Sequence, residues 1–190
     1  MALTDNNVKS AAEVRRILSA ACFAAEKHAR QRRKGADGEP YINHLLEVAE
    51  LIASSSEVLD TELVMAGLLH DTVEDTGVTM QELEERFGKD VASLVAEVTD
   101  DKSLPKETRK VLQVENAPKK SERAQTLKLA DKISNLRSLM ASPPAGWSLE
   151  RKLQYFEWAR NVVAGLTSPN RLLKAEFDRA YSKVSQLKES

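Results

Sequence analysis

The chain has 190 residues, of which 42% are apolar, 30% charged and 5% aromatic, and this length is enough for one domain with a single core. Its 28 basic side chains nearly balance its 29 acidic ones, so the net charge of −1 provides no overall field to hold nucleic acid or an anionic membrane. Cys22 is the single cysteine, which excludes an internal disulfide and a thiolate-rich zinc site.

Composition also favours helices. Seven glycines and six prolines are few for this length, so a turn-rich all-β architecture is disfavoured and a mostly helical chain is expected. No run reaches the roughly 18 apolar residues that a membrane-spanning helix needs. The first ten residues lack an apolar secretory stretch. We therefore expect a cytoplasmic protein without a membrane partner.

The first two predicted helices flank a basic loop. Residues 1–9 are expected to form a flexible tail. Over residues 11–31 apolar side chains recur at three- and four-residue steps, which predicts an amphipathic helix that ends in a basic stretch. Glycines and Pro40 then interrupt the pattern, and a second helix is predicted over residues 41–54. A third helix is predicted to begin near Asp60.

The middle of the chain contains capping signals. Thr79 with Glu82 fits a capping box for a helix that ends at Gly88, and Asp90 is expected to cap the next helix. The polar residues 99–110 are predicted to form a loop that leads into a short helix. Loops of this kind often border functional sites.

The last part of the chain is predicted to hold three helices. The first covers residues 121–140, and the other two begin at Ser148 and at the pair Ser168 and Pro169, which suit helix starts. No strand or internal repeat is expected. The sequence thus predicts an all-α bundle of about eight or more helices in one domain over residues 10–190.

Two pairs of ionisable residues follow an apolar run within residues 68–76. The pairs are His70 with Asp71 and Glu74 with Asp75. If the helix continues, His70 lies over Glu74 and Asp71 over Asp75, so imidazole and carboxylates cluster on one side. Such crowding of acids is unfavourable without a cation, and a divalent metal relieves it.

Two further residues complete a candidate metal site. His44 starts the second predicted helix, and Asp131 interrupts the apolar face of the helix over residues 121–140. Together with His70 and Asp71 they provide two imidazoles and two carboxylates, which leaves positions for water and substrate on a six-coordinate ion. An ion with open positions indicates catalysis.

Structural explanations are open for the same residues. A histidine near a helix end is more often a hydrogen-bonded structural group than a ligand. Asp131 has Lys128 and Lys132 as alternative partners, and Glu74 with Asp75 fits a solvated helix end. By spacing alone, a His-Asp pair followed by a Glu-Asp pair is moderately specific.

Basic residues before the second helix suit a phosphate group. Arg33 and Lys34 lie next to the helix break and are the candidates for function, whereas the basic residues before them fit a solvated helix end. Arg151 and Tyr155 follow at i,i+4 spacing, a cation and an aromatic ring suited to phosphate and to base or ribose. Core packing is an alternative for Tyr155.

A set of ordered motifs resembles a known family. The motifs are RRKG at residues 32–35, PYINH at 40–44, HD at 70–71, ED at 74–75, EVTDDKSLPK at 97–106, KLADKISNLR at 128–137 and YFEWA at 155–159. Over roughly residues 15–188 the chain is similar to the hydrolase domain of the RelA/SpoT alarmone enzymes. It is most similar to the small stand-alone hydrolases of the metazoan SpoT homolog type.

The resemblance implies an all-helical HD-domain fold, one manganese ion, and hydrolysis of the 3′-pyrophosphate of guanosine tetra- and pentaphosphate (ppGpp and pppGpp) to GDP or GTP and pyrophosphate. The metal ligands that it implies are His44, His70, Asp71 and Asp131. It assigns Glu74 and Asp75 the catalytic role of orienting or deprotonating the attacking water. The nucleotide and phosphate contacts that it implies are Arg33, Lys34, Tyr41, Lys102, Asn135, Arg151 and Tyr155.

The chain departs from the family motif at one position, and the sequence leaves two alternative functions open. The family has proline after the histidine of its INHP motif, whereas Leu45 follows His44 here, a change that removes no ligand. An NADPH 2′-phosphatase would use the same site, and a non-catalytic alarmone-binding protein would use only the pocket. Such a site accepts manganese, iron, cobalt or zinc, and the sequence leaves the oligomeric state open, a homodimer included.

Overall fold

The computed structural model describes residues 5–187, which are helical apart from their connections and one isolated β-bridge between Arg32 and Pro40. The predicted all-α architecture is thus confirmed. In chain order the α-helices and the two short 3-10 helices (η) are α1 (Asp5–Lys27), α2 (Ile42–Ala53), α3 (Thr61–Leu69), α4 (Thr72–Asp75), α5 (Met80–Phe87), α6 (Lys89–Val98), α7 (Lys106–Asn116), η1 (Ala117–Lys119), α8 (Glu122–Ala141), α9 (Leu149–Ala164), α10 (Arg171–Ser182) and η2 (Lys183–Gln186).

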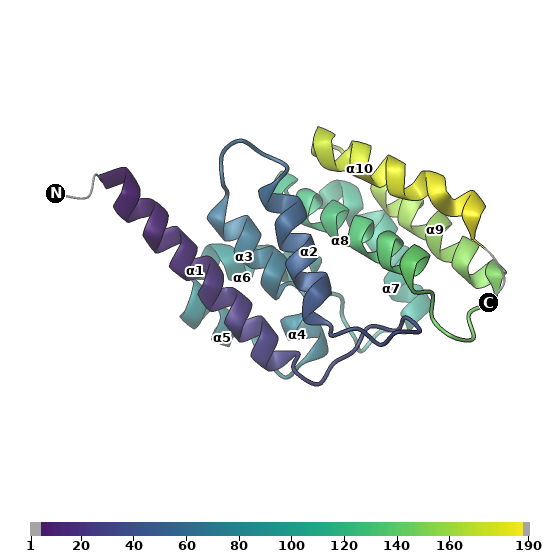
Figure 1. Ribbon diagram of the computed structural model, residues 1–190, viewed down its shortest axis with the longest axis horizontal. Helices are drawn as coiled ribbons and strands as arrows, with labels where there is room; N and C mark the ends of the chain where they lie inside the picture. Colours follow the sequence, from purple (N-terminus) through teal and green to yellow (C-terminus); the bar gives the residue numbers. More distant parts are fainter. Residues whose placement is uncertain (1–4, 188–190) are drawn as a thin grey trace.

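Helix α8 lies in the middle of the bundle, where it packs against α2, α3, α6, α9 and α10 (Figure 1). Its apolar residues do not follow a single face, and Leu127, Leu129, Ile133 and Leu136 are all buried. The polar residues between them are therefore enclosed as well. The buried polar residues of α8 are Gln125, Lys128, Asp131, Lys132 and Ser134.

Helices α2 and α3 pack closely because of a glycine. A Cβ atom on Gly67 would lie 2.9 Å from Ile52 Cδ1 and 3.3 Å from Ala49 Cα, so a larger residue would force the two helices apart. Helix α1 covers the outer side of α3 (Figure 1). This packing sets the distance between the beginning of α2 and the end of α3, which both carry predicted site residues.

Several predicted helix starts agree with the structure. Asp60 accepts a hydrogen bond from the Leu63 amide, and the side chains of Thr79, Ser121 and Ser148 cap α5, α8 and α9 in the same way. Each cap satisfies a backbone N–H that the first turn of a helix leaves without a partner.

Other boundaries differ from the prediction. Helix α1 already includes residues 5–9, whereas residues 1–4 of the expected tail lie outside the described range. Gly88, with φ of +92°, precedes α6, so Asp90 lies inside the first turn and not at the cap. Asn170 caps α10, because its side chain accepts hydrogen bonds from two amides. Among residues 5–187, no helix combines the length and apolar character that crossing a bilayer requires.

Candidate active site

The HD and ED pairs lie where α3 stops. His70 Nδ1 hydrogen-bonds to the Gly67 oxygen at 2.8 Å, and the Thr72 hydroxyl donates to the Leu69 oxygen at 2.5 Å. These side chains occupy carbonyls that a continuing helix would pair with later amides. The helix is therefore interrupted after Leu69, and the short α4 that follows carries Glu74, in place of the continuous helix assumed from the sequence.

Three elements bring the predicted metal ligands together. His44 comes from the first turn of α2, His70 follows α3, and Asp131 lies in the middle of α8. One ligand atom from each of these residues lies within 4.8 Å of the others, a spacing that can hold a metal ion. The Asp71 Oδ2 atom lies 3.1 Å from His70 Nε2 and 3.7 Å from His44 Nε2. Asp71 thus lies against both imidazoles, beside the group formed by His44, His70 and Asp131.

Both imidazoles are oriented for metal binding. The Ser134 hydroxyl donates its hydrogen to Glu47. Its oxygen therefore accepts the hydrogen bond that His44 Nδ1 donates at 2.8 Å. The His70 Nδ1 atom donates to a backbone carbonyl, and its buried Nε2 has no hydrogen-bond partner among residues 5–187. In both rings Nε2 is therefore the atom left to bind an ion.

Electrostatics favours ionised carboxylates and a positive charge at the cluster. Burial lowers the pKa of His44 and keeps its imidazole neutral. Burial works to raise the pKa of Asp131, but the Lys132 ammonium and His44 hold it well below its usual range. At His70, burial is outweighed by the nearby carboxylates, above all Asp71, and the pKa rises to about 9. The carboxylates therefore favour a positive charge at this point.

Tyr41 fixes the fourth candidate ligand. Its hydroxyl donates to Asp71 Oδ2 at 2.6 Å, and its ring stacks on the ring of His28 with centroids 5.2 Å apart. Burial and the Asp71 carboxylate raise the pKa of Tyr41, so the hydroxyl stays protonated and remains the donor. Leu45, which stands where the family has proline, is fully buried and packs in the core.

Glu74 and Asp75 lie beside this cluster with different partners. Glu74 accepts a hydrogen bond from the Asp100 amide at 3.2 Å and lies 3.5 Å from the Arg109 guanidinium. Burial raises the pKa of Glu74 above its usual value. Asp75 accepts a hydrogen bond from Gln31 at 2.8 Å and pairs with Lys102. The surroundings of Glu74 thus favour its protonated form more than water does.

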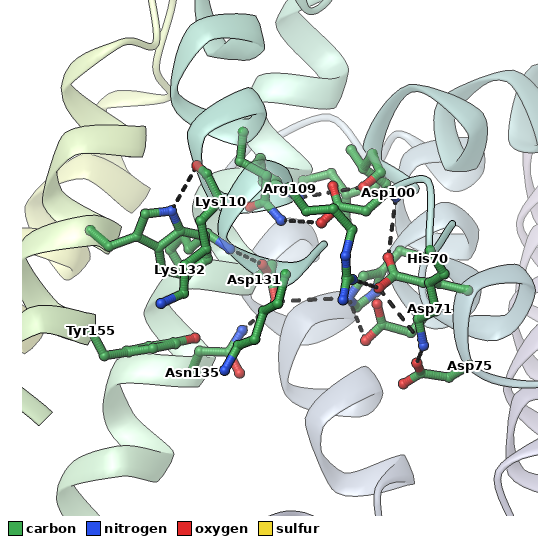
Figure 2. A pocket seen from close by; sticks show the side chains of 18 of the residues that line it. His70, Asp71, Asp75, Asp100, Arg109, Lys110, Asp131, Lys132, Asn135 and Tyr155 are labelled. Atoms are coloured by element: carbon green, nitrogen blue, oxygen red, sulfur yellow. Dashed lines mark hydrogen bonds and ion pairs between the residues drawn. The ribbon is translucent and has the colours of Figure 1, made fainter. Parts of the chain in front are cut away.

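Two cavities adjoin each other here, and the first is lined by His70, Asp71 and Asp131 of the cluster. The first has a volume of about 360 Å³ and reaches from α7 to α8, and Figure 2 shows Asp131 between Asn135 and Tyr155 on one side and His70 and Asp71 on the other. The second has a volume of about 300 Å³. The residues that line both cavities are Lys34, Tyr41, Asp75, Asn135 and Tyr155.

Most of the predicted nucleotide contacts line these cavities. Arg33 lines the second cavity and donates to the Asn135 side chain at 3.2 Å, and Lys102 lines the first. Arg151 lines neither cavity. Its guanidinium lies 4.3 Å from the ring centre of Trp147, a wall residue of the second cavity. Arg151 is thus an exposed residue that contacts the wall of the second cavity.

Sequence reasoning did not find the cations opposite the metal cluster. Lys106, Arg109 and Lys110 of α7 line the first cavity, as do Lys128 and Lys132 of α8. The spacing of these cations along each helix could have revealed them, because residues three and four positions apart share one helix face. Lys128 and Lys132 therefore lie on the face that carries Asp131, and they sit inside the KLADKISNLR motif itself.

Known proteins are similar to most of this chain. Residues 6–155 match the HD domain family. The chain is 52% identical over 165 residues to the guanosine-3′,5′-bis(diphosphate) 3′-pyrophosphohydrolase MESH1 of Xenopus tropicalis, covering 87% of this chain and 92% of the relative. It is 52% identical over 162 residues to the Homo sapiens protein of that name, covering 85% and 90%. A solved structure described as a metazoan ortholog of SpoT that hydrolyzes ppGpp matches with a TM-score of 0.85 and 45% identity, covering 90% of this chain and 97% of that chain.

Proposed function

The chain belongs to the HD-domain family and, within it, to the group of guanosine-3′,5′-bis(diphosphate) 3′-pyrophosphohydrolases, and from this premise we propose that it hydrolyses the 3′-pyrophosphate of ppGpp and pppGpp. The products are GDP or GTP and pyrophosphate. The observation that carries the proposal is the convergence of His44, His70, Asp71 and Asp131 beside two further acids, in a cavity with many cationic side chains.

The proposed metal is manganese, held by His44, His70, Asp71 and Asp131. Mixed imidazole and carboxylate ligands suit Mn²⁺ among other first-row ions. A divalent ion at this point supplies Lewis-acid activation of water and of the phosphoryl oxygen. Ser134 and Tyr41 hold two of these ligands through hydrogen bonds, so the ligand geometry is set by the fold.

Glu74 is the proposed general base. Its raised pKa makes the Glu74 carboxylate a stronger base toward the proton that it takes from water in the transition state. The Asp100 amide and the Arg109 guanidinium hold this carboxylate in place. Asp75, held by Gln31 and Lys102, is proposed to orient the attacking water. The two acids of the ED pair thus have separate tasks.

The nucleoside is proposed to bind in the second cavity. Its walls combine Arg33, Asn135, Trp147 and Tyr155, which provide hydrogen bonds and aromatic faces for a purine ribose. The 3′ substituent then points into the first cavity, where Lys34 and Lys102 neutralise phosphoryl charge. Arg151, which contacts Trp147 of this wall, is proposed to bind a phosphate of the nucleotide.

Two other functions are less well supported. An NADPH 2′-phosphatase would use the same metal site, but the relatives are named as 3′-pyrophosphohydrolases and the solved neighbour is described as hydrolysing ppGpp. A non-catalytic alarmone-binding protein would not need Glu74 and Asp75 in addition to four metal ligands. Both alternatives make clear predictions for the products.

Turnover of ppGpp and of NADPH by one preparation separates these functions. Metal-stripped protein is assayed with and without added manganese, and the released pyrophosphate and orthophosphate are quantified. We expect manganese-dependent release of pyrophosphate and GDP from ppGpp, at a kcat/KM well above that for NADPH. Orthophosphate release from NADPH as the faster reaction would replace the proposal, and stoichiometric binding of ppGpp without turnover would favour a binding protein.

A further inference from the structure

Four polar side chains of α8 lie along the first cavity: Lys128, Asp131, Lys132 and Asn135. Their spacing of three and four residues puts them on one helix face. Asp131 is the proposed metal ligand, and Asn135 also lines the second cavity, where the nucleoside is proposed to bind. Lys128 lies at the opposite end of this row, and the mechanism above assigns it no task.

The Lys128 ammonium is enclosed with few partners. The residue is 6% exposed, and its Nζ atom donates one long hydrogen bond, to the Val98 oxygen at 3.4 Å. It makes no ion pair within residues 5–187, whereas Lys132 on the same helix face binds Asp131 at 2.9 Å and lies 4.4 Å from the ring centre of Trp158. Two lysines one turn apart therefore differ in whether the protein itself neutralises them.

A buried ammonium without a counter-ion is unfavourable. It has three N–H groups to satisfy, and a hydrophobic side chain of similar length would fill the same space without that penalty. Burial, followed by repulsion from Lys132, lowers the pKa of Lys128 to about 8, although the more distant Asp131 and Asp100 carboxylates act in the opposite direction, and the group stays mostly charged at neutral pH. An anion that enters the cavity would supply the missing counter-ion.

Three cations of α7 line the same cavity. Lys106, Arg109 and Lys110 line it together with Lys128. The Nε atom of Arg109 is buried and, among the residues described, has no hydrogen-bond partner. Two buried donors without adequate acceptors, on two different helices, thus border one space. Groups of this kind bind phosphate.

We propose that Lys128 binds the terminal phosphate of the 3′-pyrophosphate and makes the site selective for a 3′-pyrophosphate over a 3′-monophosphate. This inference rests on the proposed function. Lys128 precedes Asp131 by three residues, about 4.5 Å along the helix axis, on the side away from Asn135. With the nucleoside beside Asn135 and the reacting phosphorus beside Asp131, the terminal phosphate extends toward Lys128.

The test compares ppGpp with guanosine 5′-diphosphate 3′-monophosphate, which lacks only the terminal 3′ phosphate. The KM and kcat for ppGpp are measured, and the monophosphate is measured as a competitor of ppGpp, so it need not be cleaved. In Lys128→Met we expect the KM for ppGpp to rise about 10-fold or more, the effect of losing one charged hydrogen bond. The inhibition constant of the monophosphate should change less than about 3-fold.

A matched control removes another partly buried ammonium. Lys120 lines no part of the first cavity, and its Nζ binds the Glu97 backbone oxygen. Lys120→Met should leave both constants unchanged. The thermal midpoint of Lys128→Met without nucleotide should stay equal or rise, because the variant loses a buried charge that has no counter-ion. If this variant does not fold, Lys128→Gln is measured in the same way.

The outcomes distinguish the inference from the function. Equal weakening of both nucleotides, or a lowered thermal midpoint, would show that Lys128 supports Asp131 or the fold and would overturn the inference. An unchanged KM for ppGpp would overturn it as well. If the unmodified protein does not cleave ppGpp, the proposed function fails, and calorimetric binding of the two nucleotides to the unmodified protein and to Lys128→Met still decides the role of Lys128.

Discussion

Helices α3 and α7 lead to the same cavity and are built in opposite ways. In α3 every residue except Glu62 is buried, and the helix packs against α1, α2, α6 and α8. In α7 no residue is buried, and the helix packs mainly against α9 and η1. Metal ligands, which need fixed geometry, follow the enclosed helix, whereas cations that neutralise phosphate stand on the peripheral one.

Removing a ligand from the enclosed side should have the largest effect. In Asp71→Ala we expect ppGpp turnover to fall to background, because the metal loses an anionic ligand and Tyr41 loses its acceptor. Turnover with added manganese measures the effect, and circular dichroism checks that the helices persist. Full manganese-dependent activity in this variant would reject the ligand assignment.

Glu74 connects the two sides, because it follows α3 and contacts Arg109 of α7. Glu74→Gln should keep manganese affinity and lose turnover by about 100-fold or more, the usual contribution of acid-base catalysis. Near-normal turnover would exclude Glu74 as the base.

The pH dependence gives a second measurement of Glu74. A general base acts only when it is deprotonated, and burial raises the pKa of Glu74. Turnover should therefore rise with pH through an acidic limb that lies above the ordinary glutamate value, and the limb should disappear in Glu74→Gln. A limb of unchanged position in the variant would assign it to another group.

Loss of the hydrogen bond that orients a metal ligand should have the next largest effect. Ser134 accepts the Nδ1 proton of His44, so Ser134→Ala should weaken manganese affinity by about 10- to 100-fold. Calorimetric titration of metal-stripped protein measures it. Thr126→Ala removes an exposed hydroxyl of the same helix and serves as the control. Equal affinities in both variants would show that His44 is oriented without Ser134.

A cation of α7 should have the smallest effect. Lys110 lines the first cavity on a helix with no buried residue, so Lys110→Met should raise the KM for ppGpp about 3- to 10-fold, less so at high salt, with little change in kcat. Lys119→Met removes a lysine outside that cavity and is the control. A large fall in kcat for Lys110→Met would mean that α7 also positions catalytic groups.

The sequence was sufficient for much of the enclosed side. Apolar periodicity and the capping signals at Thr79 and Ser148 predicted helices, because these signals are local. The candidate metal ligands could be chosen because Asp131 interrupts an apolar stripe and His70 follows one. The helix end after Leu69 was not predictable, since it depends on where two side chains place their hydrogen bonds.

The functional residues of the peripheral helix α7 were harder to predict from the sequence. Charged residues of α7 look like any solvated helix face until the fold places them opposite α8. Arg151 stays a prediction, because its i,i+4 spacing to Tyr155 suggested a cavity contact and its guanidinium lies against Trp147, a wall residue of the second cavity. Spacing along one helix does not reveal which neighbouring helix covers that face.

Manganese titration of metal-stripped protein with product analysis tests the central claim most directly. We expect pyrophosphate and GDP release from ppGpp to grow with added manganese and to saturate at one ion per chain, with the same stoichiometry by calorimetry. A rate of ppGpp cleavage that does not change with added manganese, or saturation at two ions per chain, would contradict a single cation held between α2, α3 and α8.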